Sequence, residues 1–210
     1  SSGVCSSDLG GEGGMLLLDD TARWEKAWAY KDHGKSYDAL FRREHPPGFR
    51  WVHESFGSNW RMTEMQAAIG RIHLRKLDAW STRRRELAGL LSAGFAQIDA
   101  LRLTPPPAAI EHAYYKYYAF LKPEKLRIGW DQQRVIGAIN ADGIPCVGGS
   151  CSEIYREKAF TGAGLGPTAR LPVAQALGAT SLSFLVHPTL QDADMSDTCA
   201  AVAKVLAAAC

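Results

Sequence analysis

Residues 59–68 of the chain read Asn59-Trp60-Arg61-Met62-Thr63-Glu64-Met65-Gln66-Ala67-Ala68. Thr63 suits the N-cap of a helix over residues 64–77, because its hydroxyl can accept a hydrogen bond from a free backbone N–H. Apolar residues share one face of this expected helix: Met65, Ala68, Ile69 and Ile72. Asn59 and Arg61 stand where unpaired N–H groups favour an anion, although a capping turn with Arg61 in a surface ion pair explains them equally well.

Upstream of this block the pattern predicts a strand, a helix and a loop. The apolar run over residues 15–18 predicts a buried strand. A helix is expected over residues 22–32, with Gly34 as its stop. Residues 35–57 read as one long loop, a length that usually accompanies a function or an interface.

Downstream, a second helix is expected over residues 79–98, with the triple arginine 83–85 as a solvated face or subunit contact rather than a phosphate site. Strands are then expected over residues 101–103, 112–121, 144–147 and 181–186. Helices are expected over residues 132–141 and 192–208, and loops over residues 148–152 and 161–166. This order predicts an α+β unit, a small antiparallel or mixed sheet with helices on one face.

The composition is that of an ordinary globular protein. Of 210 residues, 46% are hydrophobic and 22% are charged, which excludes a wholly disordered chain. With 24 basic and 22 acidic residues the formal net charge is +2, so no strongly basic field points to nucleic acid as a partner. No run of 18 apolar residues is present, so no membrane span is expected.

No complete catalytic or metal motif is present in the sequence. It lacks GxSxG, HExxH, a P-loop and a GxGxxG before a helix. The cysteines form no CxxC pair and have no zinc spacing with histidine, so no metal site is expected. They read as reduced thiols of a cytosolic protein: Cys5, Cys146, Cys151, Cys199 and Cys210.

The first nine residues, SSGVCSSDL, have neither a basic start nor an apolar core, so they do not read as a signal peptide. Their letters resemble a translated sequencing adapter, and the chain has no initiator Met. We therefore expect residues 1–9 to be an artefactual tail and the reading frame to be truncated at this point.

Four segments follow one family pattern: Glu12-Gly13-Gly14-Met15, His33-Gly34, Asn59–Ala68 and Arg83–Ala88. This pattern resembles the sugar-nucleotide aminotransferases of the DegT/DnrJ/EryC1/StrS group. The likeness runs from about Gly10 to Ala209, and residues 59–68 are its most specific part.

The resemblance implies an α/β fold, the pyridoxal-phosphate-dependent transferase fold type I, truncated here to the end of the large domain plus a C-terminal α+β small domain. Residues 10–62 would be the remnant of the cofactor-binding large domain, residues 63–100 the bridging helices and residues 101–210 the small domain. Such enzymes usually form homodimers with shared active sites. They take an amino group from glutamate and pass it to a nucleotide-linked keto-sugar for surface polysaccharides or glycosides, and a cytoplasmic location is expected.

The family's Schiff-base lysine falls near Cys5–Ser7, where this chain has no lysine, so no catalytic residue is assigned. A truncated reading frame explains this, and so does a natural variant that lost the lysine. The fragment alone is expected to be inactive. Two other functions stay open, a lysine-less sugar dehydratase of the same family and a non-catalytic regulatory or scaffold relative that keeps the dimer surface.

The resemblance also implies binding residues. Asn59 corresponds to the asparagine that reaches the other subunit's pyridoxal phosphate and binds its phosphate group. Arg61 and Tyr155 are the candidates for substrate binding. Three residues would shape the wall of the cofactor site: Gly11, Glu12 and Gly13.

Overall fold

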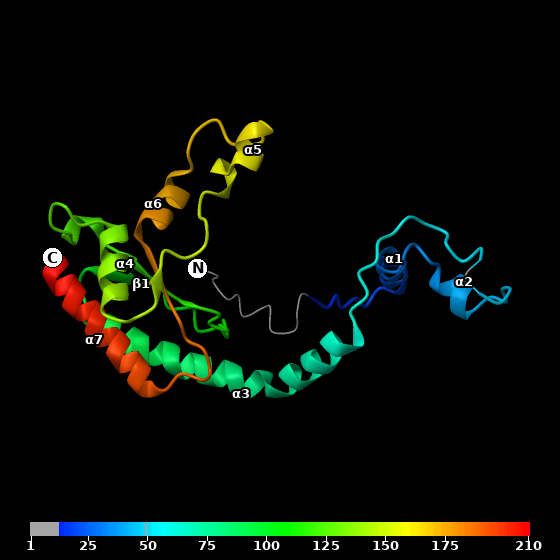
Figure 1. Ribbon diagram of the computed structural model, residues 1–210, viewed down its shortest axis with the longest axis horizontal. Coiled ribbons are helices and arrows are strands. Elements are labelled where there is room, and N and C mark those ends of the chain that lie inside the picture. The colour runs from blue at the N-terminus through cyan, green and yellow to red at the C-terminus, as the bar shows by residue number, and fades with distance from the viewer. Residues whose placement is uncertain (1–12, 49) are drawn as a thin grey trace. The chain divides into compact units, whose positions relative to one another are not determined.

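A computed structural model of the chain describes residues 13–48 and 50–210. The expected tail over residues 1–9, which includes the lysine position, lies outside the described residues, and so do Gly11 and Glu12. The chain divides into two compact units, which meet in the sequence between Lys76 and Leu77. Figure 1 labels the helices of both units and strand β1.

Helix α1 (Thr21–Lys31) forms in the first unit close to the predicted range. Asp20 caps its start by accepting a hydrogen bond from the Arg23 backbone N–H at 2.7 Å. Beyond its end, Gly34 has a φ of +79° and its N–H returns to the Ala29 carbonyl at 2.8 Å. The predicted stop at Gly34 is confirmed.

Residues 35–57 are not all loop, because helix α2 (Tyr37–Phe41) begins after Ser36. The Ser36 hydroxyl accepts a backbone N–H of the first turn at 3.2 Å. The ring of Tyr37 then packs edge-on against Trp28 of α1, with ring centroids 5.2 Å apart. The prediction of an uninterrupted loop is wrong, because so short a helix depends on these contacts and shows no periodicity of its own.

The buried strand predicted over residues 15–18 is also wrong. Residues 13–18 are irregular, and Met15 and Leu17 are 82% and 81% exposed. A strand requires hydrogen bonds to a neighbouring strand, and the described residues place none beside this segment. The apolar residues 15–18 alone were therefore insufficient to predict a strand.

Helix α3 (Glu64–Phe95) is a single helix of 32 residues where two were predicted. No glycine or proline stands at residues 77–79, and Asp78 alone carries only a small propensity penalty, so the helix continues. The predicted start is confirmed, because the Gln66 N–H donates to Thr63 Oγ1 at 3.3 Å and the Thr63 N–H donates to Gln66 Oε1 at 3.0 Å. This reciprocal pair is a capping box.

The triple arginine of α3 makes ion pairs within the second unit. Arg83 lies 2.8 Å from Asp192 and donates to the Leu190 carbonyl at 3.0 Å. Arg85 lies 2.7 Å from Glu111. All three arginines are half-buried, and Arg84 Nε is buried without a hydrogen-bond partner among the described residues, so a fully solvated face is not what the structure shows.

The second unit contains a four-stranded antiparallel sheet of order β1-β2-β4-β3. Its strands are β1 (Leu101–Leu103), β2 (Tyr117–Leu121), β3 (Cys146–Val147) and β4 (Ser181–Phe184). The sequence predicted an antiparallel or a mixed sheet, and the structure confirms the antiparallel one. Strand β2 begins at Tyr117 rather than at residue 112, because Tyr114 has a φ of +44° and interrupts the extended backbone.

Two helices of this unit stand where they were predicted and two were missed. Helices α4 (Gln132–Ala141) and α7 (Asp192–Ala209) match the sequence periodicity. Helices α5 (Lys158–Gly162) and α6 (Pro172–Thr180) were not predicted, and α5 overlaps the expected loop over residues 161–166. Neither missed helix buries a residue, and α5, with five residues, is too short to show a helical period in the sequence. Short 3-10 turns also form at Pro123–Lys125 and Ile154–Arg156.

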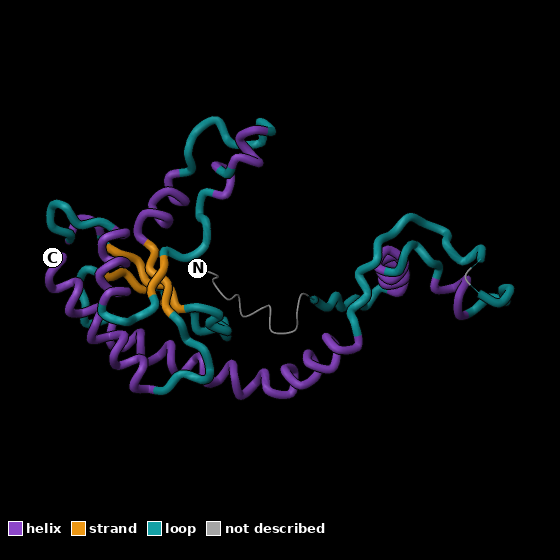
Figure 2. Tube along the Cα trace, in the orientation of Figure 1, coloured by secondary structure: helices purple, strands orange, loops and turns teal. Residues whose placement is uncertain are grey.

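The core lies between one face of the sheet and helices α3, α4 and α7 (Figure 2). The sheet contributes Tyr117, Ala119, Leu121, Leu182 and Phe184, and the helices contribute Leu87, Leu91, Phe95, Val135, Ile139, Val202 and Leu206. Cys146 belongs to this core at 1% exposure, and burial raises the pKa of its thiol to about 12. The cysteines of the described residues form no disulfide: Cys146, Cys151, Cys199 and Cys210.

Phe95→Ala should lower the free energy of unfolding of the second unit by about 3–5 kcal/mol, because it leaves a cavity in the core. Phe95 is 0% exposed, and its ring centroid lies 5.1 Å from that of Phe184. Urea unfolding followed by circular dichroism measures the effect. Ile128→Ala, which changes a fully exposed side chain of the same unit, is the matched control. Equal stability of the two variants would contradict this core.

Candidate functional site

The site predicted around Asn59 begins with a close backbone contact. Residues 58–60 run antiparallel to residues 31–33, just beyond the end of α1, and two backbone hydrogen bonds of 2.9 Å join them. Asp32 and Asn59 lie opposite each other between these two bonds. Facing residues in this type of pair have the shortest side-chain separation of an antiparallel ladder.

The contact requires glycine at two positions. A Cβ on Gly57 would lie 2.4 Å from the Gly34 backbone nitrogen, and a Cβ on Gly34 would lie 1.8 Å from the Ser55 carbonyl oxygen. Gly34 also has a φ of +79°, a conformation that costs other residues free energy. The His33-Gly34 motif is thereby explained by backbone geometry.

The Asp32 cluster consists of Asp32, His33, Lys35, Asn59 and Arg61. Lys35 Nζ donates to Asp32 Oδ1 at 3.2 Å, and both residues are buried. Arg61 Nη1 lies 3.8 Å from the same Asp32 oxygen. Arg61 Nε donates to Asn59 Oδ1 at 3.0 Å, and Arg61 Nη2 lies 3.4 Å from His33 Nε2. Because a guanidinium only donates, His33 Nε2 accepts.

The Asp32 carboxyl is ionised at neutral pH. Burial by itself raises the pKa of this group, but the hydrogen bond from Lys35 and the positive charges of Lys35, Arg61 and Lys31 outweigh burial and lower the pKa below its usual value of 3.8. Asp32 therefore supplies the negative charge that faces Arg61.

The orientation of the Asn59 amide follows from its partner. Arg61 Nε can only donate, so the Asn59 atom that faces it is oxygen, and the Nδ2 group with its two hydrogens faces away. Asn59 is exposed, and within the described part of the chain Nδ2 donates no hydrogen bond. An amide donor beside a guanidinium suits a phosphate oxygen. This donor set fits the phosphate role that the resemblance implies for Asn59, which stays a prediction.

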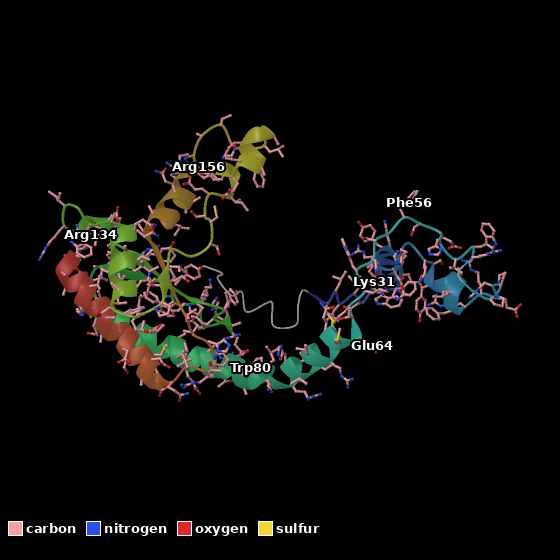
Figure 3. The ribbon with its side chains drawn as sticks, in the orientation of Figure 1. Lys31, Phe56, Glu64, Trp80, Arg134 and Arg156 are labelled. Carbon is pink, nitrogen blue, oxygen red and sulfur yellow. The ribbon has the colours of Figure 1, made fainter. Side chains whose placement is uncertain are left out.

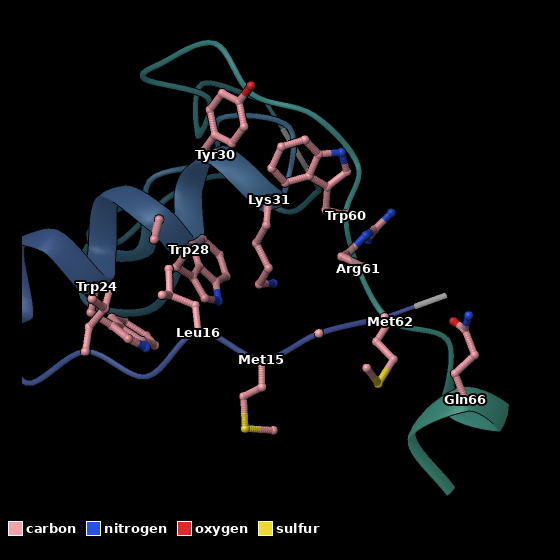
Figure 4. A pocket seen from close by; sticks show the side chains of 14 residues that line it. Met15, Leu16, Trp24, Trp28, Tyr30, Lys31, Trp60, Arg61, Met62 and Gln66 are labelled. Carbon is pink, nitrogen blue, oxygen red and sulfur yellow. The ribbon is translucent and has the colours of Figure 1, made fainter. Parts of the chain in front are cut away.

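A pocket of about 880 Å³ lies beside Arg61 in the first unit (Figure 4). Aromatic rings dominate its walls: Trp24, Trp28, Tyr30 and Trp60. In Figure 4 the Lys31 side chain extends from α1 between Trp28 and Arg61, so a second cation faces the pocket. Gly13, one of the expected cofactor-wall residues, also lines it, and a Cβ there would lie 3.0 Å from Met62 Cε.

Tyr155 lies in the second unit, and its hydroxyl already has two partners. It donates to Glu153 Oε1 at 2.6 Å and accepts the Leu171 backbone N–H at 2.9 Å. The hydroxyl proton is therefore directed at Glu153. The substrate-binding role implied for Tyr155 stays a prediction.

Glu153 is a residue that the sequence reasoning missed. Arg170 donates to it twice, at 2.9 Å and 2.5 Å, and Arg156 lies 3.6 Å away. The hydrogen bonds from Arg170 and then Tyr155 lower the pKa of the Glu153 carboxyl to about 2. We call Glu153, Tyr155 and Arg170 the Glu153 clamp; with Cys151 it adjoins a pocket of about 420 Å³. No sequence signal reveals the clamp, because Arg170 stands 17 residues away from Glu153 in the chain.

Two further features bear on the classes of function. Among residues 13–48 and 50–210, His, Cys, Asp and Glu side chains form no group of three that could hold a metal ion. In the same part of the chain no helix has the length and apolarity needed to cross a membrane.

Aminotransferases are among the solved structures that share this fold. The X-ray structure of the aminotransferase from Psychrobacter cryohalolentis matches with a TM-score of 0.89 and 46% identity, covering 96% of this chain and 53% of that chain. The chain belongs to the DegT/DnrJ/EryC1/StrS aminotransferase family, whose pattern matches residues 9–203. The resemblance inferred from the motifs and the expected fold class are thereby confirmed.

Curated relatives agree with this membership. The spore coat polysaccharide biosynthesis protein SpsC of Bacillus subtilis is 29% identical over 202 residues, which are 93% of this chain and 50% of SpsC. The Helicobacter pylori aminotransferase PseC, involved in the biosynthesis of pseudoaminic acid, shares the fold with a TM-score of 0.75 at 19% identity, over 91% of this chain and 48% of PseC. The chain spans about half the length of the relatives it matches.

Glu153→Gln should flatten the loss of second-unit stability between pH 4.5 and about pH 2. The folded pKa of Glu153 lies below its usual value of 4.5, so the clamp stabilises fully above pH 4.5 and is lost as the pH falls through about 2. Urea unfolding at a series of pH values measures this. Asp142→Asn, which removes a carboxylate paired with Lys204 in the same unit, is the matched control. Parallel pH curves for Glu153→Gln and the parent chain would contradict the clamp.

Proposed function

We propose that this chain carries the phosphate-binding arm of a pyridoxal-phosphate-dependent sugar aminotransferase. The parent enzyme would transfer an amino group from glutamate to a nucleotide-linked keto-sugar, for surface polysaccharide or glycoside biosynthesis. Membership of the aminotransferase family supports the reaction, and the name of SpsC, a spore coat polysaccharide biosynthesis protein, supports the pathway class. The observation that carries the proposal is the outward Nδ2 group of Asn59, fixed in direction by Arg61.

Each candidate residue has a role in this proposal. Asn59 holds the cofactor phosphate in the other subunit of a homodimer with shared active sites, and Arg61 and Tyr155 contact the substrate. Gly11, Glu12 and Gly13 shape the cofactor wall. Pyridoxal phosphate, when bound, supplies the electron-withdrawing ring that accepts and passes on the amino group.

The proposed order of domains along the chain is that of the family. Residues 10–62 belong to the large cofactor-binding domain, residues 63–100 bridge, and residues 101–210 form the small domain. The cytoplasm is the proposed location. Family members are pyridoxal-phosphate enzymes in general, and the amide donor of Asn59 fits the cofactor's phosphate.

Asn59→Ala should weaken binding of pyridoxal phosphate by about tenfold, because it removes a hydrogen bond to a charged group. It should leave binding of pyridoxal, which has no phosphate, unchanged. Isothermal titration calorimetry of the two ligands measures this difference. His53→Ala, at an exposed site in the same unit, is the control. An equal effect of Asn59→Ala on both ligands would refute the phosphate role.

The 210-residue chain should not transfer an amino group by itself, because no lysine stands at the family's Schiff-base position near Cys5–Ser7. The assay supplies glutamate, pyridoxal phosphate and a nucleotide-linked keto-sugar, and follows 2-oxoglutarate. Product above the level that free pyridoxal phosphate gives would contradict this expectation.

A further inference from the structure

We propose that Asp32 is a positioning residue for phosphate binding. It fixes Arg61, and through Arg61 it turns the Asn59 amide so that Nδ2 faces the phosphate. The inference rests on the proposed function and adds to it a residue that neither contacts the phosphate nor belongs to a recognised motif of the chain. Three contacts in series support it.

The first contact anchors the carboxylate. Asp32 is 7% exposed, and Lys35 Nζ holds its Oδ1 at 3.2 Å. Its backbone is fixed from both sides, because it lies opposite Asn59 between two hydrogen bonds and its carbonyl accepts the Lys35 N–H at 3.1 Å. The negative charge therefore stands at a defined place beside the phosphate-binding arm.

The second contact fixes Arg61, a long side chain that is 48% exposed. An exposed arginine without partners loses much rotamer freedom when it binds a ligand. Here Nη1 faces Asp32 at 3.8 Å and Nη2 faces His33 at 3.4 Å. With both Nη groups placed, the planar guanidinium has a single direction left for its Nε–H, and that direction is Asn59.

The third contact sets the amide. Arg61 Nε–H donates to Asn59 Oδ1 at 3.0 Å, so the amide cannot turn over without placing two donors face to face. An amide free to turn over would present its oxygen to the phosphate in one of its two orientations, and two acceptors repel. Asp32, acting through Arg61, thus keeps the Asn59 amide in the one orientation in which it donates to the phosphate.

The sign of the effect separates positioning from simple electrostatics. Asp32 is negative, so its charge alone weakens binding of a nearby anion, and Asp32→Asn would then tighten binding of pyridoxal phosphate. Positioning through Arg61 predicts the opposite, weaker binding. The two explanations therefore differ in direction and not only in size.

The experiment measures affinities of pyridoxal phosphate and of pyridoxal by calorimetry for the 210-residue chain and its variants. Asp32→Asn should weaken binding of pyridoxal phosphate about five- to tenfold and leave pyridoxal unchanged. Combined with Asn59→Ala, it should add nothing, because Asp32 acts through Asn59. Asp38→Asn, which breaks an ion pair with Arg43 in the same unit, is the matched control and should bind like the parent chain.

Arg61→Lys is the second variant, and it serves if Asp32→Asn does not fold. It keeps the positive charge at an exposed position but loses the Nε donor, and it should weaken binding of pyridoxal phosphate to the same extent. In ¹H–¹⁵N spectra, Asp32→Asn and Arg61→Lys should each shift the Asn59 side-chain amide signals, whereas Asp38→Asn should not.

The outcomes are distinct. If Asn59→Ala weakens binding of pyridoxal phosphate and Asp32→Asn tightens it or leaves it unchanged, the inference fails and the proposed function stands. Additive effects of Asp32→Asn and Asn59→Ala would also overturn the inference. If the unmutated chain binds pyridoxal phosphate no more tightly than pyridoxal, or binds neither, the proposed function fails and the inference with it.

Discussion

The approach of Gly57 to Gly34 is the constraint on which the candidate site depends. Any side chain at either position would collide with backbone, so the segment that carries Asn59 can lie along the end of α1 only because both residues are glycine. That contact places Asn59 opposite Asp32, and the charge of Asp32 in turn faces Arg61. The donor geometry is thus a consequence of backbone packing before any side chain acts.

The second unit depends on a different interaction, the burial of one sheet face. Side chains from α3, α4 and α7 converge on alternate residues of β2 and β4, so three separate helices share one core. The Glu153 clamp lies outside that core and joins Arg170 to the segment around Tyr155 by charge-assisted hydrogen bonds instead. Apolar burial and ionic contacts therefore stabilise different parts of the same unit.

Local chemistry could be read from the sequence, and contacts between distant residues could not. The Thr63 cap, the stop at Gly34 and the helices α4 and α7 were predicted because each signal lies within a few neighbouring residues. The strand expected at residues 15–18 was wrong because strands need partners, and α2 was missed because rings on α1 stabilise it. At the site, the motif pointed to Asn59 and Arg61, while Asp32 and Glu153 became visible only when the structure placed their cationic partners beside them.

The contrast between buried and exposed thiols gives the chain a natural position for a reporter group. Alkylating reagents react with thiolates. Burial raises the pKa of Cys146 to about 12, so this core thiol is not alkylated at neutral pH. Burial also raises the pKa of Cys199, whereas Cys151 is exposed. Once Cys5 and Cys210 are replaced by serine, a fluorophore attached to Cys151 would stand at the pocket beside the Glu153 clamp and would report a molecule that binds there by a change in emission.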